Sequence, residues 1–464
     1  MTFAAMHDPP SQGGLSHGQQ QVLYTIARQT WRFFAADTDP NTHLPMDNIG
    51  FYGAPAQGAY TSPTDIGVYF WSVVAAEDLG LIDRAGALQR VNATLSEVES
   101  LTKWDGFLLS WYDTMNGDVL SGPGGTDIQG QPLTGDFIST VDNAWYAMGL
   151  ILVRQVYPEL AQRATALLNA MNFSIFYDNG DESTNVNAGQ VYGGYYADQG
   201  PATFEYGVLN SETRITAYLG IGLHQMPGDV WWRTWRTLPA DFTWQGQTPQ
   251  GYNATYTDPQ SGKQFTVFEG HYSSNGMNFV PSWGGSMFES LMDNLVIPET
   301  QWGVRSFGRN DLLYPQAQIA YDTQTLHYPV WGLSPSSTPD DTGNYDAYGA
   351  HNLASNSNCC PYDETAVTPH ASFLALVVAP QQAFQNIQAL RSLYPSIYDR
   401  YGFFDAVNPM TGQVGHRYLV LDQAMIMAGL DNALRFEQMQ NHFAQDPVIQ
   451  AVRPYLSMET FSLP

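Results

Sequence analysis

The sequence contains very few lysines, only two cysteines and no long apolar run. Lys103 and Lys263 are its only lysines, and 18 basic residues stand against 44 acidic ones, which gives a formal net charge of −26. This charge disfavours nucleic acid and anionic membranes as partners, because their phosphates repel it. It suits a neutral or cationic substrate, and solubility alone is an equally good explanation. No apolar run approaches the ~20 residues of a membrane-spanning helix.

The two cysteines, Cys359 and Cys360, are adjacent, which leaves open either a vicinal disulfide or two free thiols. No His or Cys pair has the spacing of metal ligands, so we expect no metal and no cofactor. The N-terminus lacks the basic and apolar regions of a signal peptide. We expect a secreted or periplasmic protein whose signal has been removed, and a cytoplasmic location stays open. The sequence does not indicate an oligomeric state.

The chain shows no Gly/Ser/Pro linker and no break in composition. We therefore expect a disordered segment over residues 1–15 and a single domain over residues 16–464. About a dozen segments with helical periodicity alternate with loops, among them residues 18–36, the helix opened by Ser62-Pro63 and the helix capped at Ser139-Thr140. Strands are few, and no βαβ rhythm is present. The pattern predicts an all-α fold, an (α/α)6 barrel with a few short β-hairpins in its loops.

One stretch, YGVLNSETRITAYLG over residues 206–220, combines a helix start with two charged side chains. Asn210 or Ser211 is placed to cap the helix, which puts Glu212 in its first turn and Arg214 two residues further on. Both side chains would then leave the mouth of the helix beside Tyr206. The alternative is a purely structural role for Glu212 as a capping residue.

Acidic residues recur where glycine-rich or aromatic loops enter helices, and aromatic residues accompany them. The acids are Asp136, Asp142, Glu212, Glu289, Asp405 and Asp422, and the aromatics include Trp111, Trp145, Tyr206, Trp283, Trp331 and Tyr345. Glycoside hydrolysis requires such carboxyl pairs, because one carboxylic acid protonates the leaving oxygen and one carboxylate activates water or attacks carbon. Taken singly, each acid is more often a helix cap and each tryptophan more often a core residue.

The chain resembles the glucoamylase-like family that contains the endo-β-1,2-glucanases of glycoside hydrolase family 144 and the cyclisation domain of cyclic β-1,2-glucan synthases. Collinear segments carry this resemblance over residues 104 to about 435, and they include GFLLSWYDTMNGDVL, FISTVDNAWYAMGLI, YGVLNSETRITAYLGI, PSWGGSMFESLM, YDAYGAHNLA and YGFFDAVNP. The resemblance implies an (α/α)6 barrel and hydrolysis of β-1,2-glucan or sophoro-oligosaccharides. Trp145 and Tyr146 depart from the smaller residues expected after STVD, and the Cys359-Cys360 insertion is not a known family feature.

Positions that match the family's motifs receive its roles. The resemblance implies that Glu212 is the catalytic acid, that Asp405 is the candidate base and that Asp142 is a second pocket carboxylate. Expected substrate contacts are Trp283, Trp331, Tyr206, Arg214, Trp145, Trp111, Asp136, Glu289 and Tyr345. The expected partner is an oligo- or polysaccharide, and inversion is the favoured mechanism. Two alternatives remain: an enzyme that hydrolyses or transglycosylates another glycan, and a non-catalytic glycan-binding protein on the same scaffold.

Overall fold

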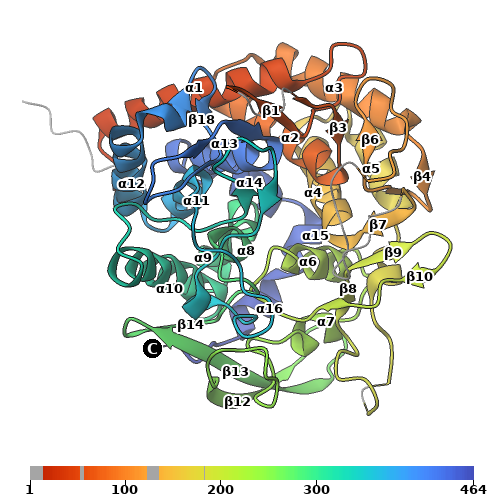
Figure 1. Ribbon diagram of the computed structural model, residues 1–464. Coiled ribbons are helices and arrows are strands. Elements are labelled where there is room, and N and C mark those ends of the chain that lie inside the picture. The colour runs from red at the N-terminus through yellow and green to blue at the C-terminus, as the bar shows by residue number, and fades with distance from the viewer. Residues whose placement is uncertain (1–13, 53–56, 123–134, 182, 464) are drawn as a thin grey trace, which may run out of the picture.

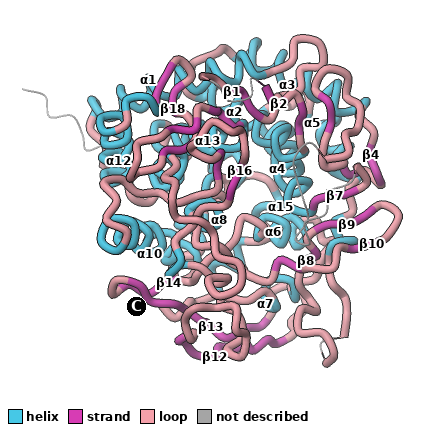
Figure 2. Tube along the Cα trace, viewed as in Figure 1, coloured by secondary structure: helices cyan, strands magenta, loops and turns pink. Residues whose placement is uncertain are grey.

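The computed structural model describes residues 14–52, 57–122, 135–181 and 183–463. The expected disordered segment at residues 1–15 lies outside this part except for Gly14 and Leu15, and Leu15 is buried in the core. Helices form two concentric layers around one axis, with loops and short strands gathered over one end (Figure 1, Figure 2). Within the described residues, no helix has the length and apolar character needed to cross a membrane.

The inner layer is a closed ring of helices. In chain order they are α2 (Pro63–Asp78), α4 (Thr140–Val156), α6 (Arg214–Gly222), α8 (Met287–Leu291), α11 (Pro369–Leu374) and α13 (Val420–Leu434). Helix α4 packs against α2 and α6, α11 packs against α8 and α13, and α13 packs against α2, so the last inner helix closes on the first. The guanidinium of Arg214 joins α6 to α8 by donating to the carbonyls of Glu289 and Ser290 at 3.1 and 2.8 Å.

The outer layer covers this ring. Its long members each pack on an inner helix: α1 (His17–Asp37) on α13 and α2, α3 (Arg84–Ser100) on α2, α5 (Ala161–Ala170) on α4, α10 (Phe307–Ala320) on α8, and α12 (Pro380–Leu393) on α11. Shorter helices complete it: α7 (Asp229–Arg233), α9 (Glu299–Trp302), α14 (Gln438–Ala444), α15 (Pro447–Gln450) and α16 (Arg453–Met458). Nearly every residue of α2, α4 and α13 is buried, which is expected of helices enclosed on all sides.

Local sequence explains how α2 begins and how it packs. Ser62 and Asp65 form a capping box, and Pro63 occupies the first helical position, where its missing N–H costs nothing. Gly67 lets α4 approach closely, because a Cβ at this position would lie 2.4 Å from the carbonyl oxygen of Trp145. Any larger side chain would push the two inner helices apart.

The strands are short and form small antiparallel sheets at the ends of the helices. Two of these sheets have three strands: β1 (Asn48–Gly50), β2 (Gln57–Gly58) and β21 (Arg417–Leu419) form one, and β7 (Phe137–Ser139), β9 (Gly194–Tyr196) and β10 (Gly200–Pro201) form the other. The two-stranded sheets of the first half of the chain are β3 (Tyr60–Thr61) with β6 (Tyr112–Asp113), β4 (Lys103–Trp104) with β5 (Phe107–Leu108), and β8 (Val191–Tyr192) with β11 (Glu205–Tyr206). Those of the second half are β15 (Ser336–Ser337) with β16 (Tyr345–Asp346), β17 (Tyr398–Asp399) with β18 (Gly402–Phe403), and β19 (Ala406–Val407) with β20 (Val414–Gly415). The pairing of β1 with β21 ties the N-terminal loop to the start of α13.

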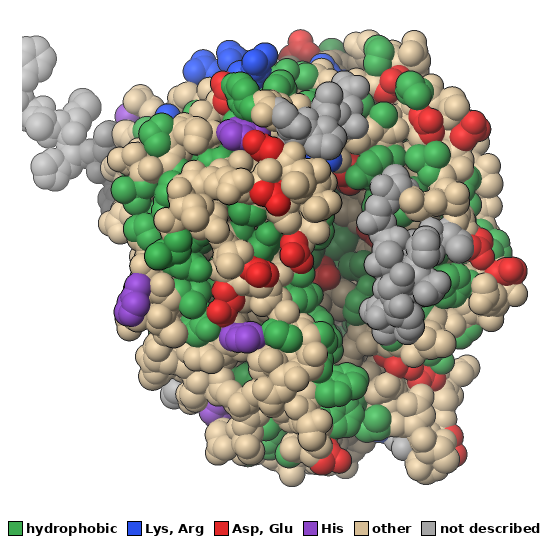
Figure 3. Space-filling model, in the orientation of Figure 1, with side chains coloured by type: hydrophobic (Ala, Val, Ile, Leu, Met, Phe, Trp, Pro, Cys, Tyr) green, Lys and Arg blue, Asp and Glu red, His purple; other side chains and the backbone are tan. Residues whose placement is uncertain are grey.

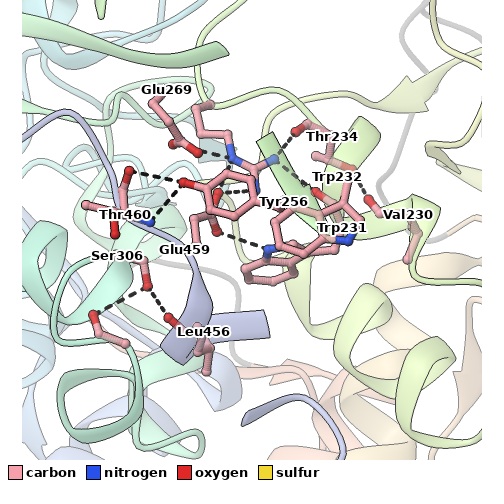
Figure 4. Close-up of polar contacts among 12 residues, drawn as sticks. Val230, Trp231, Trp232, Thr234, Tyr256, Glu269, Ser306, Leu456, Glu459 and Thr460 are labelled. Atoms are coloured by element: carbon pink, nitrogen blue, oxygen red, sulfur yellow. Dashed lines mark hydrogen bonds and ion pairs between the residues drawn. The ribbon is translucent and has the colours of Figure 1, made fainter. Parts of the chain in front are cut away.

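One hairpin is longer than the short ones expected. Strand β12 (Gln250–Thr257) pairs with β13 (Gln264–Ser274), and β14 (Met277–Phe279) adds a third strand. The C-terminal segment is fastened beside it: Arg236 Nε donates to Glu459 Oε1 at 2.5 Å, and Trp231 Nε1 donates to Glu459 Oε2 at 3.0 Å. Figure 4 shows Glu459 between Glu269 and the indole of Trp231. Burial and the charge of Glu459 raise the pKa of Glu269 to about 8.

The helix expected after residue 210 starts later than predicted. It begins at Arg214, and its N-cap residue, Thr213, makes no side-chain capping bond. The Asn210 side chain donates instead to the carbonyl of Val280, and the Ser211 hydroxyl donates to Glu212. Neither residue caps the helix, and Glu212 lies in the preceding turn.

Candidate active site

Acidic side chains gather where the inner helices begin. Asp65, Asp142, Glu289 and Asp422 each occupy the third position of their inner helix, on α2, α4, α8 and α13. Glu212 directly precedes α6. Because the inner helices run in the same direction, these positions converge at one end of the ring. Figure 3 shows a hollow in the centre of this face, with acidic side chains around it.

Glu212 lies in a partly buried position with another acid next to it. Its Oε2 accepts a hydrogen bond from Ser211 Oγ at 2.8 Å. Burial and then the negative charge of Glu289 raise the pKa of Glu212 to about 7. A large fraction of this carboxyl group is therefore protonated at neutral pH, which is the state required of a general acid. Burial, and then the charges of the nearby Glu212 and Asp142, raise the pKa of the Tyr206 phenol.

Glu289 is buried and holds the loop over residues 282–286. Its carboxylate accepts from Ser282 Oγ at 2.6 Å and from the Gly284 N–H at 2.9 Å, and it forms a capping box with Ser286. Burial raises the pKa of Glu289 in spite of these bonds. Tyr362 packs on this loop, because a Cβ on Gly284 would meet the Tyr362 ring at 2.0 Å. Glu289 therefore positions one wall of the hollow and supplies the charge that acts on Glu212.

Asp405 and Asp422 form a second carboxyl pair. The two side chains are close electrostatic neighbours. Asp405 Oδ2 also accepts from the Ser337 N–H at 2.7 Å, and His370 Nδ1 lies 3.1 Å from Asp422 Oδ2. Burial raises the pKa of Asp422 to about 7 and lowers the pKa of His370 to about 4. Burial and then the charge of Asp422 raise the pKa of Asp405 well above its usual range. The imidazole is thus neutral near pH 7.

A third group of side chains closes the remaining side. Asp47 Oδ2 accepts from Asn48 Nδ2 at 2.6 Å, and burial raises the pKa of Asp47. Tyr60 bonds to Asp47 and meets the Trp111 ring edge-on at a centroid distance of 5.4 Å. Asp142 accepts a hydrogen bond from Thr64 Oγ1 on α2. Trp111 thus packs against Tyr60, and its role as a substrate contact stays a prediction.

Tyr345 connects these groups. The residue is 54% exposed. Desolvation inside the hollow, followed by the charges of Asp422, Asp405, Glu212 and Asp47, raises the pKa of its phenol. One phenol thus responds to acids from α13, from the turn before α6 and from the N-terminal loop. These acids therefore all lie near one phenol.

Three expected substrate contacts are wrong. Trp331 is only 5% exposed, and its backbone pairs with the side-chain amide of Asn386 on α12, so its ring belongs to the core. Trp145 is 1% exposed and packs against Trp71. Arg214 is fully buried in an ion pair described below. Glycine and proline around Trp331 predict a loop, but they do not predict which way a ring points.

The other expected contacts have different environments. Trp283 and Tyr206 keep partly exposed side chains, and their role as substrate contacts stays a prediction. Asp136 lies in the turn before β7, where burial and a hydrogen bond with Asp198 raise its pKa. Cys359 and Cys360 are joined as a vicinal disulfide.

Several residues of the site were not predicted. Asp65 follows Ser62 in the same cap-and-acid pattern as Asp142 after Ser139 and Glu289 after Ser286, so this spacing could have revealed it. Asp47, Tyr60, Tyr362 and His370 carry no such signal. No group of three His, Cys, Asp or Glu side chains in the described part of the chain is arranged to hold a metal ion.

Comparisons with known proteins agree on one family and one fold. The family model Glycoamylase, described as "Putative glucoamylase", matches residues 206–447, and a model of a family of unknown function, DUF3131, matches residues 25–204. The endo-β-1,2-glucanase from Chitinophaga pinensis, solved with sophorotriose and glucose, is 19% identical, with a TM-score of 0.69 over 96% of this chain and 98% of that one. The endo-β-1,2-glucanase from Talaromyces funiculosus, solved with sophorose, is 10% identical, with a TM-score of 0.67 over 96% and 93%.

A curated relative is much longer. The cyclic β-(1,2)-glucan synthase NdvB of Rhizobium meliloti is 24% identical over an alignment that covers 93% of this chain and 18% of the synthase. The chain therefore spans about a fifth of the length of this relative. The family resemblance expected from the sequence motifs is confirmed.

Proposed function

We propose that this chain, which belongs to the Glycoamylase family, is a glycoside hydrolase that cleaves β-1,2-linked glucan or sophoro-oligosaccharides. We further propose that residues 16–464 form one (α/α)6 catalytic domain, since α13 closes the ring on α2. Support for this substrate comes from the fold, which is similar to that of two endo-β-1,2-glucanases, and from the similarity to a β-(1,2)-glucan synthase. A neutral glucan also suits a protein with a net charge of −26.

The observation that supports the proposal is that Glu212 and the pair Asp405 and Asp422 all act electrostatically on one phenol, that of Tyr345. Glu212 has a pKa of about 7 and is available as the acid that protonates the glycosidic oxygen. Asp405, next to Asp422, is the proposed base, and in its ionised form it accepts a proton from the attacking water. In this arrangement the Ser337 N–H orients Asp405, and the neutral His370 adds no positive charge that would weaken the base.

Asp142 has the supporting role in this mechanism. It is partly exposed, and its carboxylate is held by Thr64. From this position it orients a sugar hydroxyl near Tyr206. It is also the alternative base, because it is more exposed than Asp405. Comparing kcat for Asp142→Asn and Asp405→Asn decides between the two carboxylates.

A panel of glucans tests the substrate. The protein is incubated with β-1,2-, β-1,3-, β-1,4- and β-1,6-linked glucans, and the new reducing ends are counted. We expect release from β-1,2-glucan alone. New reducing ends from another linkage only would show that the substrate is a different glycan. Binding without any cleavage would favour a non-catalytic glycan-binding protein.

The pH dependence of the rate should report Glu212. The general acid works only while protonated, so kcat/KM should fall as the pH rises through about 7. Glu289→Gln removes the adjacent negative charge, lowers the pKa of Glu212 and should shift the falling limb to lower pH. The measurement is a pH–rate profile of both proteins, with exposed Glu159→Gln as the control and thermal melts to confirm folding. A falling limb that stays in place or moves to higher pH would remove Glu289 from this role.

A further inference from the structure

Four aromatic rings form a continuous row beside the acidic hollow. Trp235, Phe242, Trp244 and Trp283, here called the aromatic ledge, meet edge to face, with successive centroid distances of 5.3, 5.7 and 6.4 Å. Trp244 is 48% exposed, and the other three are partly exposed. Rings at these distances support one another and keep their orientation. An exposed row of rings is unusual for a side chain type that normally buries most of its surface.

Both ends of the ledge are attached to segments that carry site residues. The Trp235 ring packs on Gly207, where a Cβ would lie 2.9 Å from it, and Gly207 follows Tyr206. At the other end Trp283 precedes Gly284, whose N–H donates to Glu289. Tyr206 and Glu289 are both electrostatic neighbours of Glu212. The ledge therefore runs alongside Glu212, from one flank of the acid to the other.

The loop over residues 356–360 bonds to the backbone of both Trp244 and Trp283. The N–H of Asn358 donates to the carbonyl of Trp244 at 2.8 Å, and the N–H of Asn356 donates to the carbonyl of Trp283 at 3.1 Å. The Asn356 side chain also donates to the carbonyl of Cys360, whose sulfur is bonded to Cys359. The ledge is thus held before any ligand arrives, which reduces the entropy that binding would cost.

The chemistry around the ledge suits a neutral, polyhydroxylated ligand. Residues 239–250, PADFTWQGQTPQ, contain one charged residue, Asp241, and several amides and hydroxyls. Gln247 Nε2 donates to the carbonyl of Asn352, which places an amide at the edge of the ledge. Aromatic faces cover the apolar faces of sugar rings, while neutral amides bond to hydroxyl groups. Hydrophobic side chains also lie along the wall of the hollow in Figure 3.

We propose that the aromatic ledge is an outer sugar-binding subsite, in which Trp244 stacks on a glucose unit of the glycan beyond the bond that is cleaved. The inference rests on the proposed function and extends it. It assigns to Trp244 a contact that only a chain long enough to reach the ledge can make. Short substrates that occupy the hollow alone should not depend on it.

The test compares Trp244→Ala with Phe436→Ala on two substrates, long β-1,2-glucan and the shortest sophoro-oligosaccharide that the wild type cleaves. Phe436 is a matched control, since it is 65% exposed and follows the far end of α13. For Trp244→Ala we expect KM for the long glucan to rise by about tenfold, as the loss of one good ring contact implies, while kcat and the values for the short substrate stay the same. Trp244→Phe should lie between, and Phe436→Ala should match the wild type.

The outcomes separate the two proposals. An active Trp244→Ala enzyme with an unchanged KM for long glucan would overturn the subsite and leave the proposed function intact. Equal losses on both substrates, with an unaltered melting temperature, would place Trp244 in the hollow itself and also overturn an outer subsite. A wild type that cleaves no β-1,2-glucan would overturn both proposals.

Discussion

Glu212→Gln should lower kcat on β-1,2-glucan by about 10²–10⁴-fold, the range associated with loss of general acid catalysis. Glutamine keeps the shape of the side chain and can still accept the hydrogen bond from Ser211, but it has no proton to give to the leaving oxygen. Because burial already favours the neutral form at this position, the neutral amide should not disturb the fold. Initial rates and glucan binding by calorimetry are the measurements.

The control for this variant is Glu159→Gln, an exposed glutamate of the outer layer. It should keep wild-type rates. If Glu212→Gln retained more than about a tenth of the activity, well above the ~10²-fold loss expected at least, the acid would have to be another residue. Normal turnover together with lost binding would instead make Glu212 a substrate-binding group.

Arg214→Met should destabilise the protein rather than weaken substrate binding. Arg214 Nε lies 2.8 Å from Glu299 Oε1 and Nη1 lies 3.4 Å from Asp293 Oδ2, with all three side chains fully buried. Removing the cation leaves two acids in a low-dielectric interior, which costs about 3–5 kcal/mol of unfolding free energy. Urea denaturation measures this loss.

Arg163→Met is the matched control. Arg163 pairs with Glu99 at 2.7 Å, but both side chains are about a third exposed, so the loss should not exceed ~1 kcal/mol. Adding Glu299→Gln to Arg214→Met should recover part of the stability by removing one unpaired charge. If Arg214→Met instead had wild-type stability and a raised KM, Arg214 would be a substrate-binding residue and this prediction would be wrong.

The sequence predicts those site residues that local structure determines. Asp142 and Glu289 follow serine caps by three residues, and this spacing puts both side chains at the mouth of a helix. Glu212 was identified by the same reasoning, although the cap expected at Asn210 or Ser211 does not form. The helical repeat also predicts α1, α2 and α13 well, because burial on one or all sides requires regularly spaced apolar residues.

The remainder depends on contacts between distant segments. Arg214 pairs with Glu299, which lies 85 residues further along the chain. No local sequence pattern distinguishes this buried ion pair from an exposed ion pair. Trp331 faces the core because Asn386 fixes its backbone from α12. Asp47 and Tyr362 come from loops far apart in the chain, and the folded ring brings Asp47 near Asp405 and Tyr362 near Glu212.

The first anomer formed on cleavage tests the arrangement of acid and base. Inversion requires water to attack from the side opposite Glu212, with a base on that side, and it converts a β-linkage into an α-anomer. NMR spectra recorded in the first minutes of β-1,2-glucan hydrolysis, before mutarotation, should therefore show the α-anomer of the new reducing end. Initial appearance of the β-anomer would contradict this account, because it would demand a covalent glycosyl-enzyme intermediate and would favour transglycosylation.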